Sequence, residues 1–106
     1  MKVLIADDEM DIRDALGRKL RREGFDVVLC GDGLEALRAF HAERPDIVIL
    51  DIVMPGGMDG LTTCQRIREI ADTPIMMLSA QAITEESVID GLNAGADEYL
   101  IKPIRL

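Results

Sequence analysis

Hydrophobic and polar positions follow two patterns that alternate along the chain. Five short aliphatic runs lack polar alternation, as strands do when both faces of a parallel sheet are covered. These runs lie at 2–7, 25–30, 47–51, 74–79 and 97–101. Between them, apolar residues recur at helical spacing over 11–20, 34–40, 61–70 and 84–94. The pattern therefore predicts strands and helices in alternation.

Breakers and capping residues mark the ends of these elements. Gly24 follows a basic last turn in the first helix, and Asp32 to Glu35 has the spacing of a capping box. The second helix must end before Pro45. Gly91 lies inside the fourth helix, where glycine costs about 1 kcal/mol relative to alanine. We expect that helix to be the weakest.

Strands separated by helices require right-handed crossovers, so the sheet is expected to be parallel. The fold class is therefore a doubly wound α/β domain over 1–106. Only residues 104–106 follow the Lys102-Pro103 break after the fifth strand, so a C-terminal fifth helix is missing from this chain. We interpret the chain as one domain that is cut off after its fifth strand.

The amino-acid composition of the chain bears on which binding partners it can have. The net charge of −8 argues against nucleic acid or an anionic membrane as a direct partner. No apolar run approaches transmembrane length. Cys30 and Cys64 form no short motif, which indicates free thiols in a reducing cytoplasm.

Polar residues capable of chemistry stand at the ends of the predicted strands. Asp7 and Asp8 end the first strand, Asp51 the third and Ser79 the fourth, and Lys102 follows the fifth. With a strand order of 2-1-3-4-5 the three aspartates meet where the winding reverses, which is where such sheets bind ligands. Carboxylates that crowd together repel each other unless a cation lies among them, and hard oxygen ligands suit Mg²⁺.

Six short motifs in a fixed order give the chain a family resemblance. It resembles the receiver domain of a bacterial two-component response regulator, which implies a flavodoxin-like five-stranded sheet. The matching segments are A-D-D-E at 6–9, L-D-I-V-M-P at 50–55, M-D-G at 58–60, S-A at 79–80, G-A-D-E-Y at 95–99 and K-P at 102–103.

The resemblance implies a phosphorylation site. Asp51 would accept a phosphoryl group from a histidine of a sensor kinase. Asp8 and Asp51 would bind Mg²⁺ directly, the backbone carbonyl of Val53 would be a further ligand, and Asp7 would act through water. The domain would be a signalling domain and not an enzyme, although it would assist its own phosphorylation and dephosphorylation.

Further roles follow from the same resemblance. Lys102 and Ser79 would contact phosphoryl oxygens, and a phosphoryl group would draw Ser79 inward so that Tyr99 could move. The face formed by the fourth helix and fifth strand would then change. Val53 and Gln81 would tune dephosphorylation, which we expect to be slow to moderate. The Lys102–Pro103 peptide bond is expected to be cis.

Several alternatives and departures remain open. A pseudo-receiver would bind partners without phosphorylation. A haloacid-dehalogenase-like phosphatase would need a second aspartate where Val53 stands. The chain has one glycine more than usual at 56–57, which enlarges the loop after Asp51. Expected partners are a sensor histidine kinase and a second copy in a homodimer or domain-swapped dimer. DNA would be reached only through an output domain absent from this chain.

Overall fold

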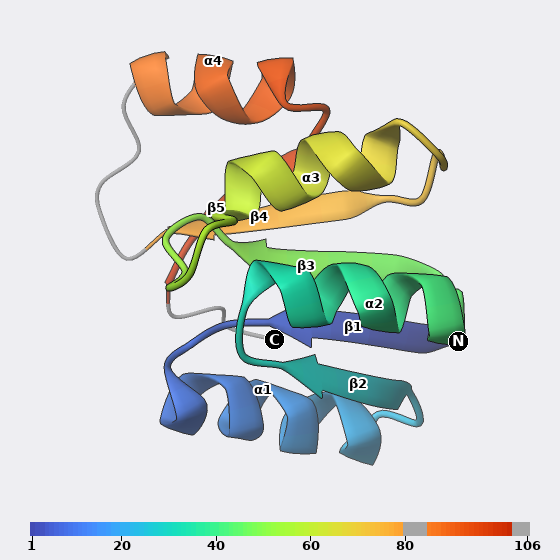
Figure 1. The fold of residues 1–106 in the computed structure, drawn as a ribbon. Coiled ribbons are helices and arrows are strands. Elements are labelled where there is room, and N and C mark those ends of the chain that lie inside the picture. Colours follow the sequence, from blue (N-terminus) through green and yellow to red (C-terminus); the bar gives the residue numbers. More distant parts are fainter. Residues whose placement is uncertain (80–84, 103–106) are drawn as a thin grey trace.

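The computed structural model describes residues 1–79 and 85–102, which form a five-stranded parallel sheet with helices on both faces (Figure 1). The strand order is β2-β1-β3-β4-β5, which confirms the prediction. The elements are β1 (Lys2–Ala6), α1 (Met10–Arg22), β2 (Asp26–Cys30), α2 (Gly33–Glu43), β3 (Ile47–Asp51), α3 (Gly60–Arg68), β4 (Ile75–Ser79), α4 (Glu85–Asn93) and β5 (Glu98–Ile101). As predicted, no helix follows β5 in the part of the chain that the structure describes.

The aliphatic runs form strands because both of their faces are covered. Leu4 of β1 and Leu50 of β3 are fully buried on the face that carries α2, α3 and the segment just after α4. Val3 and Ile5 point to the opposite face, where they pack with Leu16 of α1. Burial of successive residues on opposite faces explains why the strands lack polar alternation.

The helix ends agree with the sequence signals, with small differences. Asp32 caps α2, since its Oδ1 accepts a hydrogen bond from Glu35 N at 2.8 Å. The Glu35 side chain accepts from Gly31 N instead of completing the capping box at Asp32. The predicted extent of α3 was too long: the helix ends at Arg68, and Ile70 lies beyond it with an exposed side chain.

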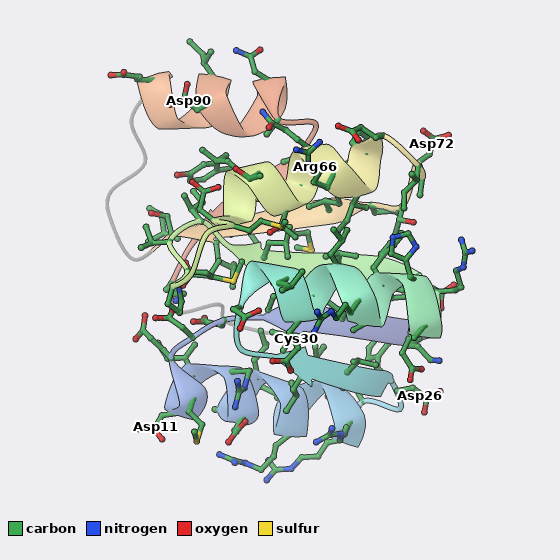
Figure 2. All side chains as sticks on the ribbon, viewed as in Figure 1. Asp11, Asp26, Cys30, Arg66, Asp72 and Asp90 are labelled. Carbon is green, nitrogen blue, oxygen red and sulfur yellow. The ribbon has the colours of Figure 1, made fainter. Side chains whose placement is uncertain are left out.

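Charged side chains lie mainly on the outside of these layers. Figure 2 shows Asp26, Arg66 and Asp90 pointing outward, whereas Cys30 is buried in the interior. Within the described ranges, no helix is both long and apolar enough to cross a membrane.

Candidate functional site

The acidic residues meet at the carboxyl ends of the two central strands. β1 pairs with β3 in parallel register, so Asp7, just after β1, comes close to Asp51, the last residue of β3. Both side chains are buried, while that of Asp8 is exposed. Carboxylate oxygens of the three residues all lie within 4.8 Å of one another. The predicted cluster is therefore present as a geometric arrangement.

Lys102 reaches this cluster from the end of β5. Its backbone N donates to Ser79 O at 2.8 Å, which holds Lys102 beside the end of β4. Its Nζ lies 2.8 Å from Asp7 Oδ2 and 3.1 Å from Asp51 Oδ2, and the lysine side chain is only 5% exposed. The four strand ends named in the sequence analysis thus converge, with a buried ammonium group between two buried carboxylates.

The electrostatics of the pocket reflect crowding of like charges. Burial raises the pKa of Asp51 to about 6; the ion pair with Lys102 opposes this shift, and the charge of Asp7 adds to it. Burial by itself would lower the pKa of Lys102, but its carboxylate partners outweigh burial and hold the pKa above its usual value. One lysine therefore balances the buried acids only in part.

The donor set fits a divalent cation. Asp7 Oδ1 accepts a hydrogen bond from Glu9 N at 2.9 Å, but its Oδ2 accepts none from the described residues. Oδ2 does lie 2.8 Å from Lys102 Nζ, as an ion pair. A buried carboxylate oxygen with one cationic partner, next to a second carboxylate of raised pKa, is the hard oxygen environment that suits Mg²⁺.

The loop that follows Asp51 folds back tightly onto it. Gly60 N donates to Ile52 O at 2.8 Å, and a Cβ on Gly60 would lie 2.0 Å from Asp51 O. Glycine is therefore required at the start of α3 for this close approach. At the loop tip, by contrast, a Cβ on Gly56 or Gly57 would meet no atom within 4 Å. The added glycine consequently lies in open space.

The other predicted site residues lie around the pocket or outside the described ranges. Val53, two residues after Asp51, is 73% exposed. Tyr99 is half-buried on β5, and a Cβ on Gly91 of α4 would lie 2.8 Å from its Cδ2. Gln81 and the predicted cis bond before Pro103 are outside the described residues.

Sequence reasoning missed two features. Glu9 was given no role beyond its place in the A-D-D-E segment, but its Oε1 lies 3.0 Å from Lys102 Nζ. Arg68, at the end of α3, donates to the carbonyl oxygens of Gly95 and Thr73 and to Asp97 Oδ2. It thereby ties α3 to the starts of β4 and β5. No local spacing signals the contact of Glu9 with Lys102 or those of Arg68 with Gly95 and Asp97, because each joins residues far apart in the sequence.

The fold and the site together define a class of protein. This class consists of doubly wound α/β domains with an acidic pocket at the topological switch point. The family model of the response regulator receiver domain matches residues 3–106. The chain therefore belongs to the response regulator receiver domain family of two-component systems, and its role is one of signalling.

Curated relatives are named as transcriptional regulators. The chain is 51% identical to the probable transcriptional regulator ycf27 of Guillardia theta, over 96% of this chain and 39% of that protein. It is 46% identical to the transcriptional regulatory protein CseB of Streptomyces coelicolor, over 95% of this chain and 42% of that protein. The chain thus spans about two fifths of the length of these relatives.

Solved structures agree with this assignment. The Francisella response regulator 1452 receiver domain superposes with a TM-score of 0.89 at 35% identity, covering 98% of this chain and 85% of that one. The BeF3-activated N-terminal receiver domain of RstA from Klebsiella pneumoniae gives a TM-score of 0.90 at 28% identity, covering 99% of this chain and 88% of that one.

Proposed function

We propose that Asp51 is the phosphoacceptor of this receiver domain and that the donor is a phosphohistidine of a sensor histidine kinase. In the reaction, the bond between phosphorus and the imidazole nitrogen breaks, a bond from phosphorus to an Asp51 carboxylate oxygen forms, and the imidazole gains a proton. The observation that supports this best is the geometry of Lys102, whose Nζ lies 3.1 Å from Asp51 Oδ2 within a cluster of carboxylates.

The acidic cluster would hold the Mg²⁺ ion on which this transfer depends. Asp8 and Asp51 would be direct ligands together with the backbone carbonyl of Val53, and Asp7 would act through water. When bound, Mg²⁺ would neutralise charge on the phosphoryl oxygens and on Asp51. The buried Oδ2 of Asp7, which shares its partner Lys102 with Asp51, supports this assignment.

Lys102 and Ser79 would contact phosphoryl oxygens once the acyl phosphate has formed. Lys102 is already in place, since its side chain is buried with Nζ beside Asp51. Ser79 ends β4, one strand over from Asp51, and its backbone carbonyl accepts from Lys102 N. Transfer of a phosphoryl group requires chiefly positioning and charge neutralisation, which these groups can supply. The domain would thereby assist its own phosphorylation and dephosphorylation.

Phosphorylation would shift the population of the α4 and β5 face. Movement of Ser79 toward the phosphoryl group would leave room for Tyr99, whose ring now lies against Gly91 of α4. A side chain at position 91 would occupy the space beside the ring, so the glycine leaves Tyr99 freedom to change its rotamer. The change in the Tyr99 rotamer would transmit the phosphorylation state of Asp51 to the surface.

We further propose that the domain works in the cytoplasm and controls transcription through a DNA-binding region outside these 106 residues. The relatives named above are transcriptional regulators more than twice as long as this chain. A net charge of −8 is unsuited to DNA contact by this segment itself. Cys30 and Cys64 are buried free thiols whose pKa values are raised by burial, as suits a reducing compartment.

Incubation with acetyl phosphate and Mg²⁺, followed by intact-mass measurement, tests the proposal. The wild type should gain one phosphoryl group, and EDTA should prevent the gain. The Asp51→Asn variant should gain nothing, whereas Asp26→Asn, a matched change of an exposed aspartate at the start of β2, should behave as wild type. Equal phosphorylation of Asp51→Asn and wild type would refute Asp51 as the acceptor, and an unmodified wild type would favour a pseudo-receiver.

A further inference from the structure

Lys102 has a third carboxylate partner that does not belong to the candidate metal cluster. Glu9 Oε1 lies 3.0 Å from Lys102 Nζ, as close as the cluster carboxylates. The three partners differ in exposure: the side chain of Glu9 is 51% exposed, against 1% for Asp7 and 7% for Asp51. Glu9 therefore contacts the ammonium from the solvent side, and the two aspartates contact it from within the pocket.

The Glu9 side chain contacts Lys102 instead of capping its own helix. Glu9 is the N-cap residue of α1, yet its side chain makes no capping hydrogen bond. An N-cap position ordinarily satisfies one of the free N–H groups of the first helical turn. The side chain instead contacts Lys102, which lies 93 residues further along the sequence.

A cation entering the pocket would compete with Lys102 for the same oxygens. Asp7 and Asp51 are partners of Lys102 and also members of the cluster that could hold a metal ion. Two cations cannot share these carboxylates without mutual repulsion. Lys102 consequently needs another carboxylate when the cluster is occupied, and Glu9 is placed to be that partner.

We propose that Glu9 is a positioning residue for phosphoryl transfer: it holds Lys102 at the rim of the pocket so that Mg²⁺ can bind while the ammonium stays beside Asp51. This inference rests on the proposed function, because it assumes that the cluster binds Mg²⁺. Without Glu9, Lys102 pairs with Asp7 and Asp51 alone and resists displacement by the metal.

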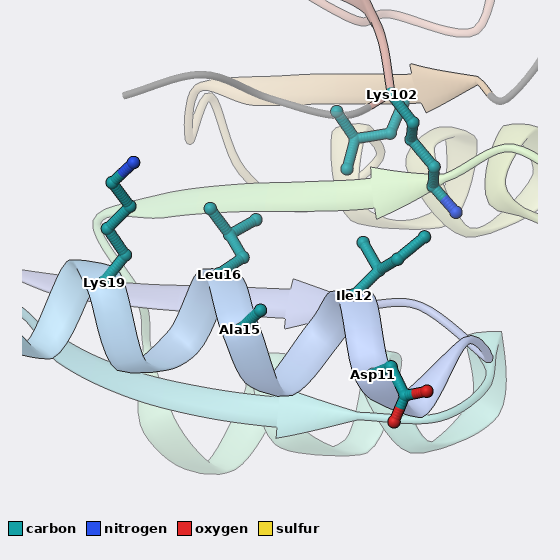
Figure 3. A pocket seen from close by; sticks show the side chains of 7 residues that line it. Asp11, Ile12, Ala15, Leu16, Lys19 and Lys102 are labelled. Carbon is teal, nitrogen blue, oxygen red and sulfur yellow. The ribbon is translucent and has the colours of Figure 1, made fainter.

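Titration of the metal-free domain with MgCl₂ in a calorimeter tests this without any phosphorylation step. Glu9→Gln should weaken Mg²⁺ binding about fivefold, since a half-exposed ion pair contributes up to about 1 kcal/mol. Asp11→Asn is the matched control, because it removes one negative charge from the first turn of α1. In Figure 3 the Asp11 carboxylate points away from Lys102, and screening should keep its effect below about twofold.

A double-mutant cycle separates positioning from bulk charge. In a Lys102→Met background, Glu9→Gln should change Mg²⁺ affinity by less than about twofold, because there is no ammonium left to hold. The inference is overturned if Glu9→Gln and Asp11→Asn weaken Mg²⁺ binding equally in the wild-type background. It is also overturned if Glu9→Gln changes Mg²⁺ affinity as much in Lys102→Met as in the wild type. The comparison of Glu9→Gln with Asp11→Asn remains a valid test even if Lys102→Met fails to fold.

The outcomes also distinguish this inference from the proposed function. A wild type that is phosphorylated at Asp51 and binds Mg²⁺, but with the same affinity as Glu9→Gln, refutes the role of Glu9 alone. A wild type that binds no Mg²⁺ removes the metal from the proposed function, and the role of Glu9 with it.

Discussion

Lys102 carries the only positive charge that the described residues place among the carboxylates of Asp7, Glu9 and Asp51. Removal of one partner from a buried ion pair is costly because the charges left behind remain desolvated. The folded domain should therefore depend on Lys102 most strongly when no metal is bound.

We expect Lys102→Met to lower the free energy of unfolding by about 3 kcal/mol in EDTA. The buried carboxylates would then repel each other without compensation, and added Mg²⁺ should reduce the difference from wild type. Urea unfolding in EDTA and in Mg²⁺ measures both effects. Arg18→Met, an exposed position on α1 outside the groove beside that helix, is the control. Equal stability of the two variants in EDTA would show that the ion pairs of Lys102 contribute nothing.

Val53 should affect how fast the phosphorylated domain loses its phosphoryl group. Its exposed apolar side chain, two residues after Asp51, cannot hydrogen-bond a water molecule that attacks the acyl phosphate. Val53→Asn should speed dephosphorylation by up to about tenfold, the contribution of one hydrogen bond. The decay of the phosphorylated mass over time gives the rate, with Val53→Ala as the control. An unchanged rate in Val53→Asn would contradict this role.

The described side chains of α4 bury little apolar surface against the sheet. Of its described side chains, Ile89 and Leu92 are exposed, while the buried positions are Gly91 and, just past the helix, Ala94. Small residues bury little apolar area, so these two positions contribute little packing energy to α4. That the helix containing Gly91 is the weakest stays a prediction.

Amide hydrogen exchange should therefore change in α4 when Asp51 is phosphorylated. We expect the change in residues 86–94, because Gly91 of this helix lies against the ring of Tyr99. The amides of α2, which is anchored by the buried side chains of Ala36 and Phe40, should exchange equally in both states. Equal protection of α4 with and without the phosphoryl group would contradict its role in the switch.

The sequence predicted elements and strand ends well because both depend on local patterns. Unbroken aliphatic runs fix the strands, and parallel strands bring Asp7, Asp51 and Lys102 to one edge of the sheet. The Lys102 contact with Glu9 could not be predicted, because a flexible side chain near a helix end has several possible partners. The end of α3 was misjudged because Ile70 continues the helical spacing although the helix stops at Arg68.

At the scale of the whole molecule, the two faces of the sheet are covered unequally. Of the described helices, α2 and α3 pack on one face, together with the segment just after α4, and α1 packs on the other. Beside α1 lies a groove of about 350 Å³ whose lining includes Ile12, Ala15, Leu16 and Leu78 (Figure 3). Apolar surface of this kind favours association.

We expect this face to cause self-association. Light scattering should give a molar mass above that of the monomer, and the mass should rise with concentration. Ala15→Glu should reduce association without disturbing the core, since Ala15 is exposed at the groove. Glu86→Ala, an exposed position on α4, serves as the control. A monomeric mass at every concentration would show that the groove is not an association surface.

The central claim is that the carboxylate of Asp51 takes the phosphoryl group. Reduction with borohydride after treatment with acetyl phosphate and Mg²⁺ converts an aspartyl phosphate to homoserine, and peptide mass spectrometry locates the altered residue. The account predicts homoserine at position 51 and an unaltered Asp7 and Asp8. Homoserine at position 7 or 8, or no altered aspartate in a protein that has gained a phosphoryl group, would contradict it.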